Sequence, residues 1–523
     1  MCVKKCDILI AATSQEKEAA MAAQIASSGA QVIAVHGYTP EQTATALAMI
    51  SRTTYPILKV LAEVTGGKAL EFFEKYFVNY GHASIADMAT IVFVCEGISQ
   101  ISAWELWFEY LAGGQEKSTR YGDFGNKSAI TIPPEIILAG KEDTYMRIAE
   151  GLLVQYRFWL ETVFERYRTS IPKPDGMSDR QYESTLRARA FDVARYWLFG
   201  GIKTTVAQVM SIRILERQLC RMMASPYSEV RKLAEQIRVA TMEVPPHTPE
   251  GMESVYTEPV AASLVRHIEA NQFLINLGNK RYRCAEPYDR GFDYQDLSLV
   301  ESTFLYDCDP LVLQASLLVY EGATVPLSYI MKQVAQESRS SVEAMIHFYL
   351  QDRGPHDELP LAMAAARECM FEVRLDRGAA RDFHRHRAGV QLHQRIGGHL
   401  GFAIPDVVVQ MGLDDRWAHT MRETIKLVDQ LRGTLFNMFA GQRLDYGADY
   451  LYPFACRQAS IYAGDTRAMT YLCELRTKPA GHFSYREAAW MMWQQMCERF
   501  PWMESEGRAI PFAPDSEIDI FQR

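Results

Sequence analysis

Residues 374–387, RLDRGAARDFHRHR, decide how the rest of the chain is interpreted. Three arginines of this stretch recur at every fourth position, so on a helix they would share one face. They are Arg377, Arg381 and Arg385, and the triplet Arg385-His386-Arg387 extends the cluster. The whole chain is acidic, with a net charge of −9, so this concentration of cations predicts a dedicated anion site. A surface patch paired with acidic side chains elsewhere is the alternative.

A metal site is a second alternative for the same region, because four histidines lie near the arginines. They are His384, His386, His393 and His399. Their spacing matches no common zinc pattern, and the neighbouring guanidinium groups would repel a cation. We therefore expect no metal.

Composition limits the class of protein. The chain has 523 residues, of which 48% are hydrophobic and 23% charged, and this excludes a disordered chain. Acidic residues outnumber basic ones by 64 to 55, so bulk binding to nucleic acid is not expected. The apolar runs are far shorter than the roughly 20 residues of a membrane span. Ten scattered cysteines without a CxxC pair indicate reduced thiols and a cytoplasmic protein.

The second half of the sequence repeats the order of signals in the first. A Thr-Pro step at Pro40 and an Asp-Pro step at Pro310 each precede an apolar helix. Each half then carries a β-like run, Thr90–Cys95 or Met370–Leu375, followed by a helix. The sequence therefore predicts a tandem duplication. Its expected parts are a first domain at 1–245, a connector at 246–297 and a second domain at 298–523.

Before residue 81 the sequence predicts a βαβ-like start followed by three helices. The expected elements are Asp7–Ala12, Gln15–Ser28, Gln31–His36, Thr43–Ile50, Ile57–Val64 and Ala69–Tyr80. No GxGxxG motif accompanies them, so a dinucleotide-binding fold is not indicated.

Two further clusters could hold an anion. A helix predicted at Ser211–Met222 places three arginines on one face, and these are Arg213, Arg217 and Arg221. The segment GGQEKSTRY, residues 113–121, follows two glycines with a run of side-chain donors. Taken alone, the first cluster could be a solvated helix face and the second an ordinary loop after a helix.

At these residues the sequence resembles the flavin-dependent thymidylate synthase family, whose signature is Arg-His-Arg, seven residues, then Ser-x-Arg. The first half keeps Ser118-Thr119-Arg120 but has Phe108-Glu109-Tyr110 at the expected place of Arg-His-Arg. The second half keeps Arg385-His386-Arg387 but has Arg395-Ile396-Gly397 in place of Ser-x-Arg. The two halves are therefore degenerate in complementary ways.

A later pattern of that family is Ala-Arg followed at a fixed distance by a second arginine. The first half has it as Ala194-Arg195 and Arg213, whereas the second half has Ala448-Asp449 and Arg467. Because the Asp449 carboxylate would repel a phosphate, Arg195 is expected to be the phosphate-binding residue. Pairing of Arg195 with Asp192 on the same helix is the alternative.

The resemblance implies an α+β fold of two tandem domains, each with a central sheet flanked by helices. It implies reductive methylation of dUMP to dTMP, with methylenetetrahydrofolate and NADPH as co-substrates and FAD as cofactor. The sites would lie between a nucleotide-binding first half and a flavin-binding second half, in a homodimer of tandem chains. A non-catalytic nucleotide-binding protein and a flavin-dependent methylase of another pyrimidine nucleotide are the alternatives.

By the same resemblance, Ser118 and Arg195 would be catalytic. Substrate would be bound by Gln115, Glu116, Ser118, Thr119, Arg120, Arg195 and Arg221. The cofactor would be bound by His82, Arg213, Arg385, His386, Arg387, Arg467 and Arg476.

Overall fold

The structure, a computed structural model, describes most of the chain from residue 38 onward. The described residues are 38–50, 54–64, 83–120, 122–243, 271–289, 292–294, 297–303, 308–353, 360–367, 369–438, 443–500, 503–506, 508–515, 517–519 and 521. Four predicted elements lie outside them, namely Asp7–Ala12, Gln15–Ser28, Gln31–His36 and Ala69–Tyr80.

The chain divides into two compact units, each assembled from separate stretches of sequence. One comprises Met1–Phe93, Val209–Leu219 and Glu235–Ile268. The other, which we call the large unit, comprises Val94–Gln208, Cys220–Ala234 and Glu269–Arg523. The large unit holds parts of both predicted domains, and the domain limits remain a prediction. The predicted connector is partly helical, because helix α11 spans Gln272–Asp289 and packs on a core of the large unit.

Secondary structure repeats along the chain in the order that the sequence predicts. The first half contains α2 (Pro40–Met49), α3 (Ile57–Glu63), η2 (Ala83–Met88), β1 (Thr90–Ser99), α5 (Gln100–Leu106), β2 (Gly113–Glu116), η3 (Lys127–Ala129), α6 (Pro134–Leu138), α7 (Glu142–Ser170), α8 (Asp179–Ala194), η4 (Arg195–Trp197), β3 (Lys203–Ser211), α9 (Ile212–Met223) and α10 (Ser228–Met242). The second half, after α11, contains β4 (Val300–Thr303), α12 (Pro310–Tyr320), α13 (Leu327–Val334), α14 (Arg339–Leu350), η6 (Leu361–Ala365), β5 (Cys369–Asp376), α15 (Arg377–Phe383), β6 (Val390–His393), α16 (Asp406–Gln410), α17 (Asp414–Met438), η7 (Leu444–Leu451), β7 (Arg457–Gly464), α18 (Thr466–Arg476), α19 (Phe483–Arg499) and α20 (Met503–Glu506). These elements confirm an α+β fold built from two tandem domains.

Local sequence signals explain where paired elements begin. Both α2 and α12 start at a proline, and the residue before each, Thr39 or Asp309, caps the first turn with its side chain. The structure confirms the predicted elements that fall within the described residues, namely Thr43–Ile50, Ile57–Val64, Thr90–Cys95, Ser211–Met222 and Met370–Leu375. Of the described helices, none is both long and apolar enough to cross a membrane.

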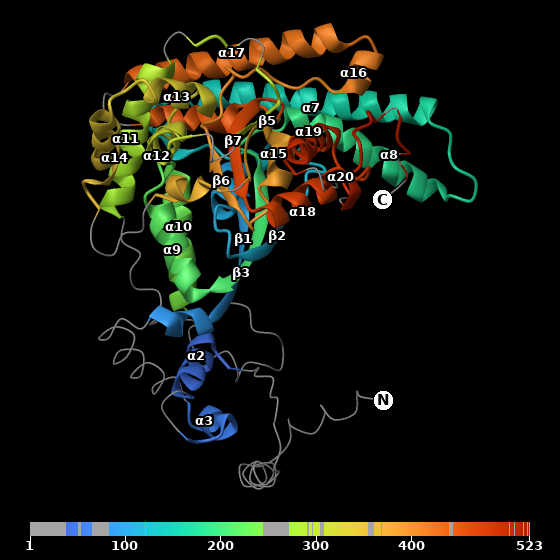
Figure 1. The fold of residues 1–523 in the computed structure, drawn as a ribbon. Helices are drawn as coiled ribbons and strands as arrows, with labels where there is room; N and C mark the ends of the chain where they lie inside the picture. The colour runs from blue at the N-terminus through green and yellow to red at the C-terminus, as the bar shows by residue number, and fades with distance from the viewer. Residues whose placement is uncertain are drawn as a thin grey trace, which may run out of the picture. The chain divides into compact units, whose positions relative to one another are not determined.

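A four-stranded antiparallel sheet, in the order β4-β5-β7-β6, lies in the large unit. Strand β5 is buried along its whole length because helices cover both faces of the sheet. Phe371 and Val373 pack into the core that includes α18 and α19, whereas Met370 packs into the core that includes α12 and α13. Figure 1 shows these strands between the two groups of helices. A second sheet has the matching order β1-β3-β2.

The two halves meet in the large unit through segments 196–201 and 450–455, which are equivalent in the repeat. Antiparallel backbone hydrogen bonds join them, from Gly201 N to Tyr450 O (2.7 Å), from Phe454 N to Leu198 O (2.7 Å) and from Ala455 N to Tyr196 O (3.0 Å). A Cβ atom at Gly200 would lie 2.9 Å from Ile101 Cγ1 and 3.1 Å from the Cα of Tyr450, so this close approach favours a glycine. The pairing relates the halves by a local two-fold axis.

Aromatic packing reinforces the same junction. Trp417 on α17 lies with its ring centroid 4.8 Å from that of Trp159 on α7 and 5.1 Å from that of Trp197. All three side chains are fully buried. The long helices α7 and α17, one from each half, run along the same side of the large unit (Figure 1).

Candidate functional site

The arginine-rich stretch of the second half forms the end of β5, helix α15 and the loop after it. Asp376 caps the helix, because its Oδ1 accepts a hydrogen bond from the Ala379 amide at 2.8 Å. The same buried carboxylate accepts hydrogen bonds from the hydroxyls of Tyr196 (2.9 Å) and Ser484. The start of α15 is therefore fixed to both halves of the chain.

Arg381 joins α15 to the Ser118–Arg120 segment of the first half. Its Nη1 donates to Thr119 Oγ1 at 3.2 Å, and its Nη2 forms an ion pair with Glu116 at the end of β2. The side chains of Arg381 and Glu116 are only 13% and 6% exposed, so solvent screens this pair little. The contact brings the Arg-His-Arg loop of one half close to the Ser-x-Arg segment of the other.

Arg120 is held by a carboxylate of its own half. Its Nε and Nη2 donate to the two oxygens of Asp192 at 2.6 and 2.9 Å, and Nη2 also donates to the Ala480 carbonyl at 3.2 Å. Burial would raise the pKa of Asp192, but the Arg120 guanidinium outweighs it and holds this pKa below its ordinary value. Ser118 Oγ accepts from the Arg120 amide at 3.2 Å, so Ser118 and Arg120 form one ordered segment.

Arg195 lies at the start of η4 and is only 2% exposed. Its Nη1 is 3.8 Å from Asp382 Oδ2, and Asp382 Oδ1 is 3.9 Å from Arg476 Nη1 on the other side. Asp192 forms its ion pair with Arg120, and Arg195 lies near Asp382 instead. The described ion pairs therefore do not include the alternative pairing of Arg195 with Asp192. The buried Nε and Nη2 of Arg195 have no hydrogen-bond partner among the described residues. Such atoms are uncommon in a folded interior, and here they are donors that suit an anion.

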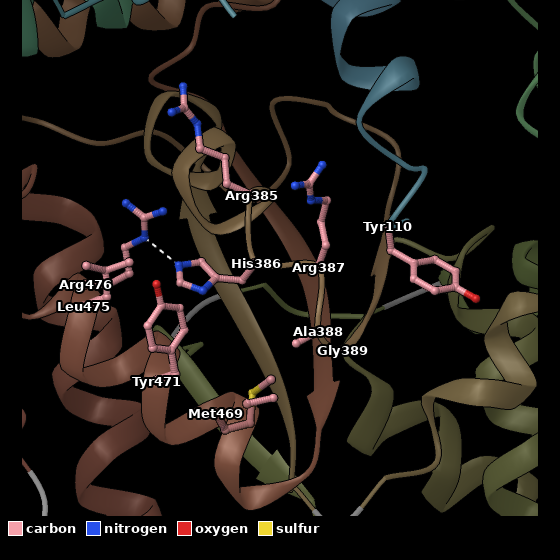
Figure 2. A pocket seen from close by; sticks show the side chains of 11 residues that line it. Tyr110, Arg385, His386, Arg387, Ala388, Gly389, Met469, Tyr471, Leu475 and Arg476 are labelled. Carbon is pink, nitrogen blue, oxygen red and sulfur yellow. Dashed lines mark hydrogen bonds between the residues drawn. The ribbon is translucent and has the colours of Figure 1, made fainter. Parts of the chain in front are cut away.

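A cavity of about 420 Å³ opens beside the Arg-His-Arg loop. Arg385, His386 and Arg387 line it from that loop, and Arg476 lines it from the end of α18 (Figure 2). Tyr110 of the first half also lines it, and none of its described lining residues is acidic. The cavity is therefore cationic and built from both halves.

The two imidazole nitrogens of His386 have different roles in this cavity. Arg476 Nε donates to His386 Nε2 at 2.7 Å, as the dashed line in Figure 2 shows. Burial, and then the charge of Arg476, lower the pKa of His386 to about 3. The ring is therefore neutral near pH 7, with its proton on Nδ1. Arg385 is exposed, whereas Arg387 is half-buried and its Nη1 has no hydrogen-bond partner among the described residues.

Several sequence-predicted residues lie apart from this cluster. Arg221 donates to the Glu105 carbonyl at 2.9 Å and is 3.8 Å from Glu109, so it lies beside the segment that replaces Arg-His-Arg. Arg467 is exposed in the first turn of α18. The remaining three are Gln115, which is exposed on β2, Arg213, which pairs with Asp87 (2.8 Å) in the smaller unit, and His82, which lies outside the described residues.

Sequence reasoning missed the acidic partners of these arginines. Asp382 lies inside the quoted stretch, and its place next to Arg381 could have marked it. The sequence offers Asp192 as a partner of Arg195, but no local signal indicates its pairing with Arg120. His384 of the stretch lies beside a histidine of β6, since its Nδ1 is 3.1 Å from His393 Nε2. Across the described residues, no group of three or more His, Cys, Asp or Glu side chains could hold a metal ion.

Comparison with known proteins identifies the family. The sequence matches the family described as thymidylate synthase complementing protein over residues 9–247 and 299–502. The chain belongs to this family. The match confirms the resemblance seen in the sequence, and it covers one segment in each half of the chain.

Relatives of similar length are distant in sequence. A UPF0159 protein of Chlamydia muridarum is 25% identical over 463 residues, which cover 87% of this chain and 83% of the relative. UPF0159 protein Ta1429 of Thermoplasma acidophilum is 21% identical over 458 residues, covering 82% of this chain and 86% of the relative. A solved flavin-dependent thymidylate synthase of Helicobacter pylori, complexed with FAD and dUMP, aligns at 20% identity with a TM-score of 0.23, covering 44% of this chain and 98% of that one.

Buried histidines should make this family member sensitive to acid. His384 is 3% exposed and stacks on Trp104, with ring centroids 4.3 Å apart, and burial lowers its pKa to about 3. An unfolded histidine titrates near pH 6.5, so below that pH the unfolded state binds more protons and stability falls as the pH decreases. The fall is at most roughly 1.4 kcal/mol per pH unit for each such histidine.

Denaturant unfolding between about pH 7 and pH 5 measures this effect. His384→Gln should lose less stability over that range than the unsubstituted chain. His419→Gln is the control, because His419 is exposed on α17. Equal pH slopes for His384→Gln and the unsubstituted chain would contradict the assignment of a neutral His384.

Proposed function

We propose that this protein is an FAD-dependent thymidylate synthase, which methylates dUMP to dTMP with methylenetetrahydrofolate as one-carbon donor and NADPH as reductant. The main support is the contact of Arg381 with Thr119 and Glu116. Arg381 lies one helical turn before the intact Arg-His-Arg triplet, so this contact supports a composite site that the triplet and the intact Ser-x-Arg segment would share. Family membership supports the same reaction class.

The residues around the 420 Å³ cavity fit FAD. A flavin dinucleotide carries an anionic pyrophosphate and a planar polar ring, and the cavity offers three guanidinium groups with no acidic residue in its described lining. Asp382 is 3.9 Å from Arg476 but does not line the cavity. The buried Nη1 of Arg387 is an unused donor. Arg385, Arg387 and Arg476 would hold the cofactor, with neutral His386 oriented by Arg476. When bound, FAD supplies the reducing equivalents for the methyl group.

The residues around Arg195 fit the phosphate of dUMP. Arg195 has two buried donors without a described partner, and Ser118 adds a hydroxyl. Arg120 is oriented by Asp192 and keeps Nη1 available beyond its bidentate pair. In this proposal Arg195 and Ser118 bind and orient the nucleotide, while Gln115, Glu116 and Thr119 shape the segment next to it. The proposed substrate site does not include Arg221, because that residue lies beside Glu109.

The proposal extends to the assembly and its location. We propose a cytoplasmic homodimer of tandem chains, in which Arg213, Arg467 and His82 reach the cofactor. A non-catalytic nucleotide-binding protein is the second candidate, and one observation favours it. Phe108-Glu109-Tyr110 leaves the first half without the flavin-binding triplet, so each chain has at most one complete set of motifs.

Release of tritium from dUMP labelled at pyrimidine C5 tests the reaction. The purified full chain should release tritium with FAD, NADPH and methylenetetrahydrofolate together, and omission of any one should stop it. A chain that binds FAD and dUMP but releases no tritium would support the non-catalytic alternative. Release with another labelled pyrimidine nucleotide and not with dUMP would support the alternative substrate.

Flavin retention should depend on the Arg-His-Arg loop. Arg385→Ala or Arg387→Ala removes a charge-assisted contact, worth about 1.5–3 kcal/mol, and should weaken FAD binding roughly ten- to hundredfold. Titration followed by flavin fluorescence measures this loss. Arg339→Ala is the control, because that side chain is 76% exposed on α14. Equal loss of FAD and dUMP binding in a folded Arg387→Ala chain would argue against the division between the two halves.

Nucleotide binding should depend on Arg195. Arg195→Ala removes the two buried donors and should weaken dUMP binding by roughly tenfold or more, as measured by calorimetry. Because Arg195 is buried beside Asp382, Ser118→Ala and Arg195→Lys serve as milder variants, and each should give a smaller loss. Unchanged dUMP affinity in all three folded variants would remove the substrate site from the first half.

A further inference from the structure

A second cavity in the large unit, of about 640 Å³, has a volume in the range of small-molecule sites. Trp104 and Phe108 line it from the first half, and Arg395, Asp445 and Tyr446 line it from the second. This cavity is therefore also built from both halves. Its first-half residues come from the region equivalent to the Arg-His-Arg region, and Arg395 of the second half comes from the position equivalent to the Ser-x-Arg segment.

The repeat makes this cavity the counterpart of the proposed substrate site. Phe108 stands where the second half has Arg385, and Arg395 stands where the first half has Ser118. Asp449, behind the cavity wall, stands where the first half has Arg195. The local two-fold axis thus pairs a site with both motifs to a site with neither.

Charge differs sharply between the two sites. Arg395 donates to both oxygens of Asp449, at 2.8 and 2.9 Å, and to Asp445 at 2.6 Å. Arg432 also donates to Asp449 at 2.6 Å, and Arg281 pairs with Glu321 on the other wall. Each of these arginines already has a carboxylate, so a phosphate dianion would have to compete with buried acids. Arg377, the fourth arginine of the lining, donates to Gln458 Oε1 at 3.2 Å and lies over the Trp104 ring. The cavity favours a ligand without net charge.

Hydrogen-bonding atoms without a described partner remain available on the wall. Gln394 is 1% exposed, and its buried Oε1 has no hydrogen-bond partner among the described residues. The same holds for the buried Nε2 of His399 and Nε of Arg432, and all three residues line the cavity. A ligand that offers both donors and acceptors would satisfy these atoms.

We infer that this cavity is a second ligand site, which takes an uncharged pyrimidine nucleoside rather than a nucleotide. The inference rests on the proposed function only for the shape of the ligand, since the counterpart site is proposed to hold dUMP. The cavity would keep a shape that suits a pyrimidine nucleoside. It lacks the proposed phosphate-binding residues and has Asp445 and Asp449 instead, so it would no longer prefer a phosphate.

Deoxyuridine is the probe, titrated by calorimetry into the full chain saturated with dUMP. Gly278 on α11 and Gly433 on α17 line the cavity, and an added Cβ at either meets no atom within 4 Å. Gly278→Phe should therefore narrow the cavity without displacing backbone, and should weaken deoxyuridine binding at least about tenfold, a loss that calorimetry resolves readily. Gly151→Phe is the matched control, because Gly151 is equally open on α7 but does not line this cavity.

The outcomes separate this inference from the proposed function. If deoxyuridine binds, and Gly278→Phe abolishes this binding whereas Gly151→Phe does not, the result supports a second site. This holds even if dUMP does not bind to the chain at all. Absence of dUMP binding would overturn only the proposed function. The inference would be overturned if deoxyuridine does not bind, or if the two variants bind it equally. It would also be overturned if dUMP displaces deoxyuridine one for one.

Asp445→Asn tests the charge argument by itself. The substitution keeps the shape of the side chain but leaves Arg395 with one carboxylate instead of two. Binding of dUMP at this cavity, measured with Arg195→Ala in the same chain, should rise relative to deoxyuridine. An unchanged ratio of the two affinities would overturn the claim that acidic residues exclude the nucleotide.

Discussion

Antiparallel pairing of segment 196–201 with segment 450–455 is the constraint on which the rest of the large unit depends. Each segment directly follows the second residue of the Ala-Arg pattern, which is Arg195 in the first half and Asp449 in the second. Pairing of the segments therefore fixes the positions of Arg195 and Asp449. It also places helix α15 of the second half over β2 of the first, where Arg381 meets Thr119. Gly200 permits the approach, since any side chain there would meet the backbone of Tyr450.

The same electrostatic device stabilises both composite sites, with different residues. Buried guanidinium groups are costly unless a carboxylate compensates them, and each site supplies one. In the proposed substrate site Asp192 orients Arg120 and leaves Arg195 only a distant contact with Asp382. In the second cavity Asp445 and Asp449 compensate their arginine fully. The number and closeness of the carboxylates, rather than the number of arginines, distinguish the proposed anion site from the second cavity.

Sequence patterns predicted the elements of this fold better than their contacts. Helix α9 and strand β5 follow from periodicity, and the tandem repeat follows from the order of signals in each half. The ion pairs of Arg120 with Asp192 and of Arg381 with Glu116 do not follow, because their partners are far apart in sequence and nothing local specifies them. Helix periodicity predicts α9 correctly but not that its arginines belong to different units. Arg213 belongs to the smaller unit, whereas Arg221 belongs to the large one.

Fusion of the two halves explains why the motifs could degenerate in complementary ways. In an oligomer of identical single domains, a substitution appears in every site, so loss of Arg-His-Arg would affect all of them. In the fused chain the local two-fold axis relates positions that carry different residues. Phe108 and Arg395 therefore line one cavity together, whereas Arg385–Arg387 line another, and helix α15 just before them contacts Thr119 through Arg381. Motif residues lost from one proposed site can therefore be kept in the other, and the altered site can then differ in the charge of the ligand that we infer for it.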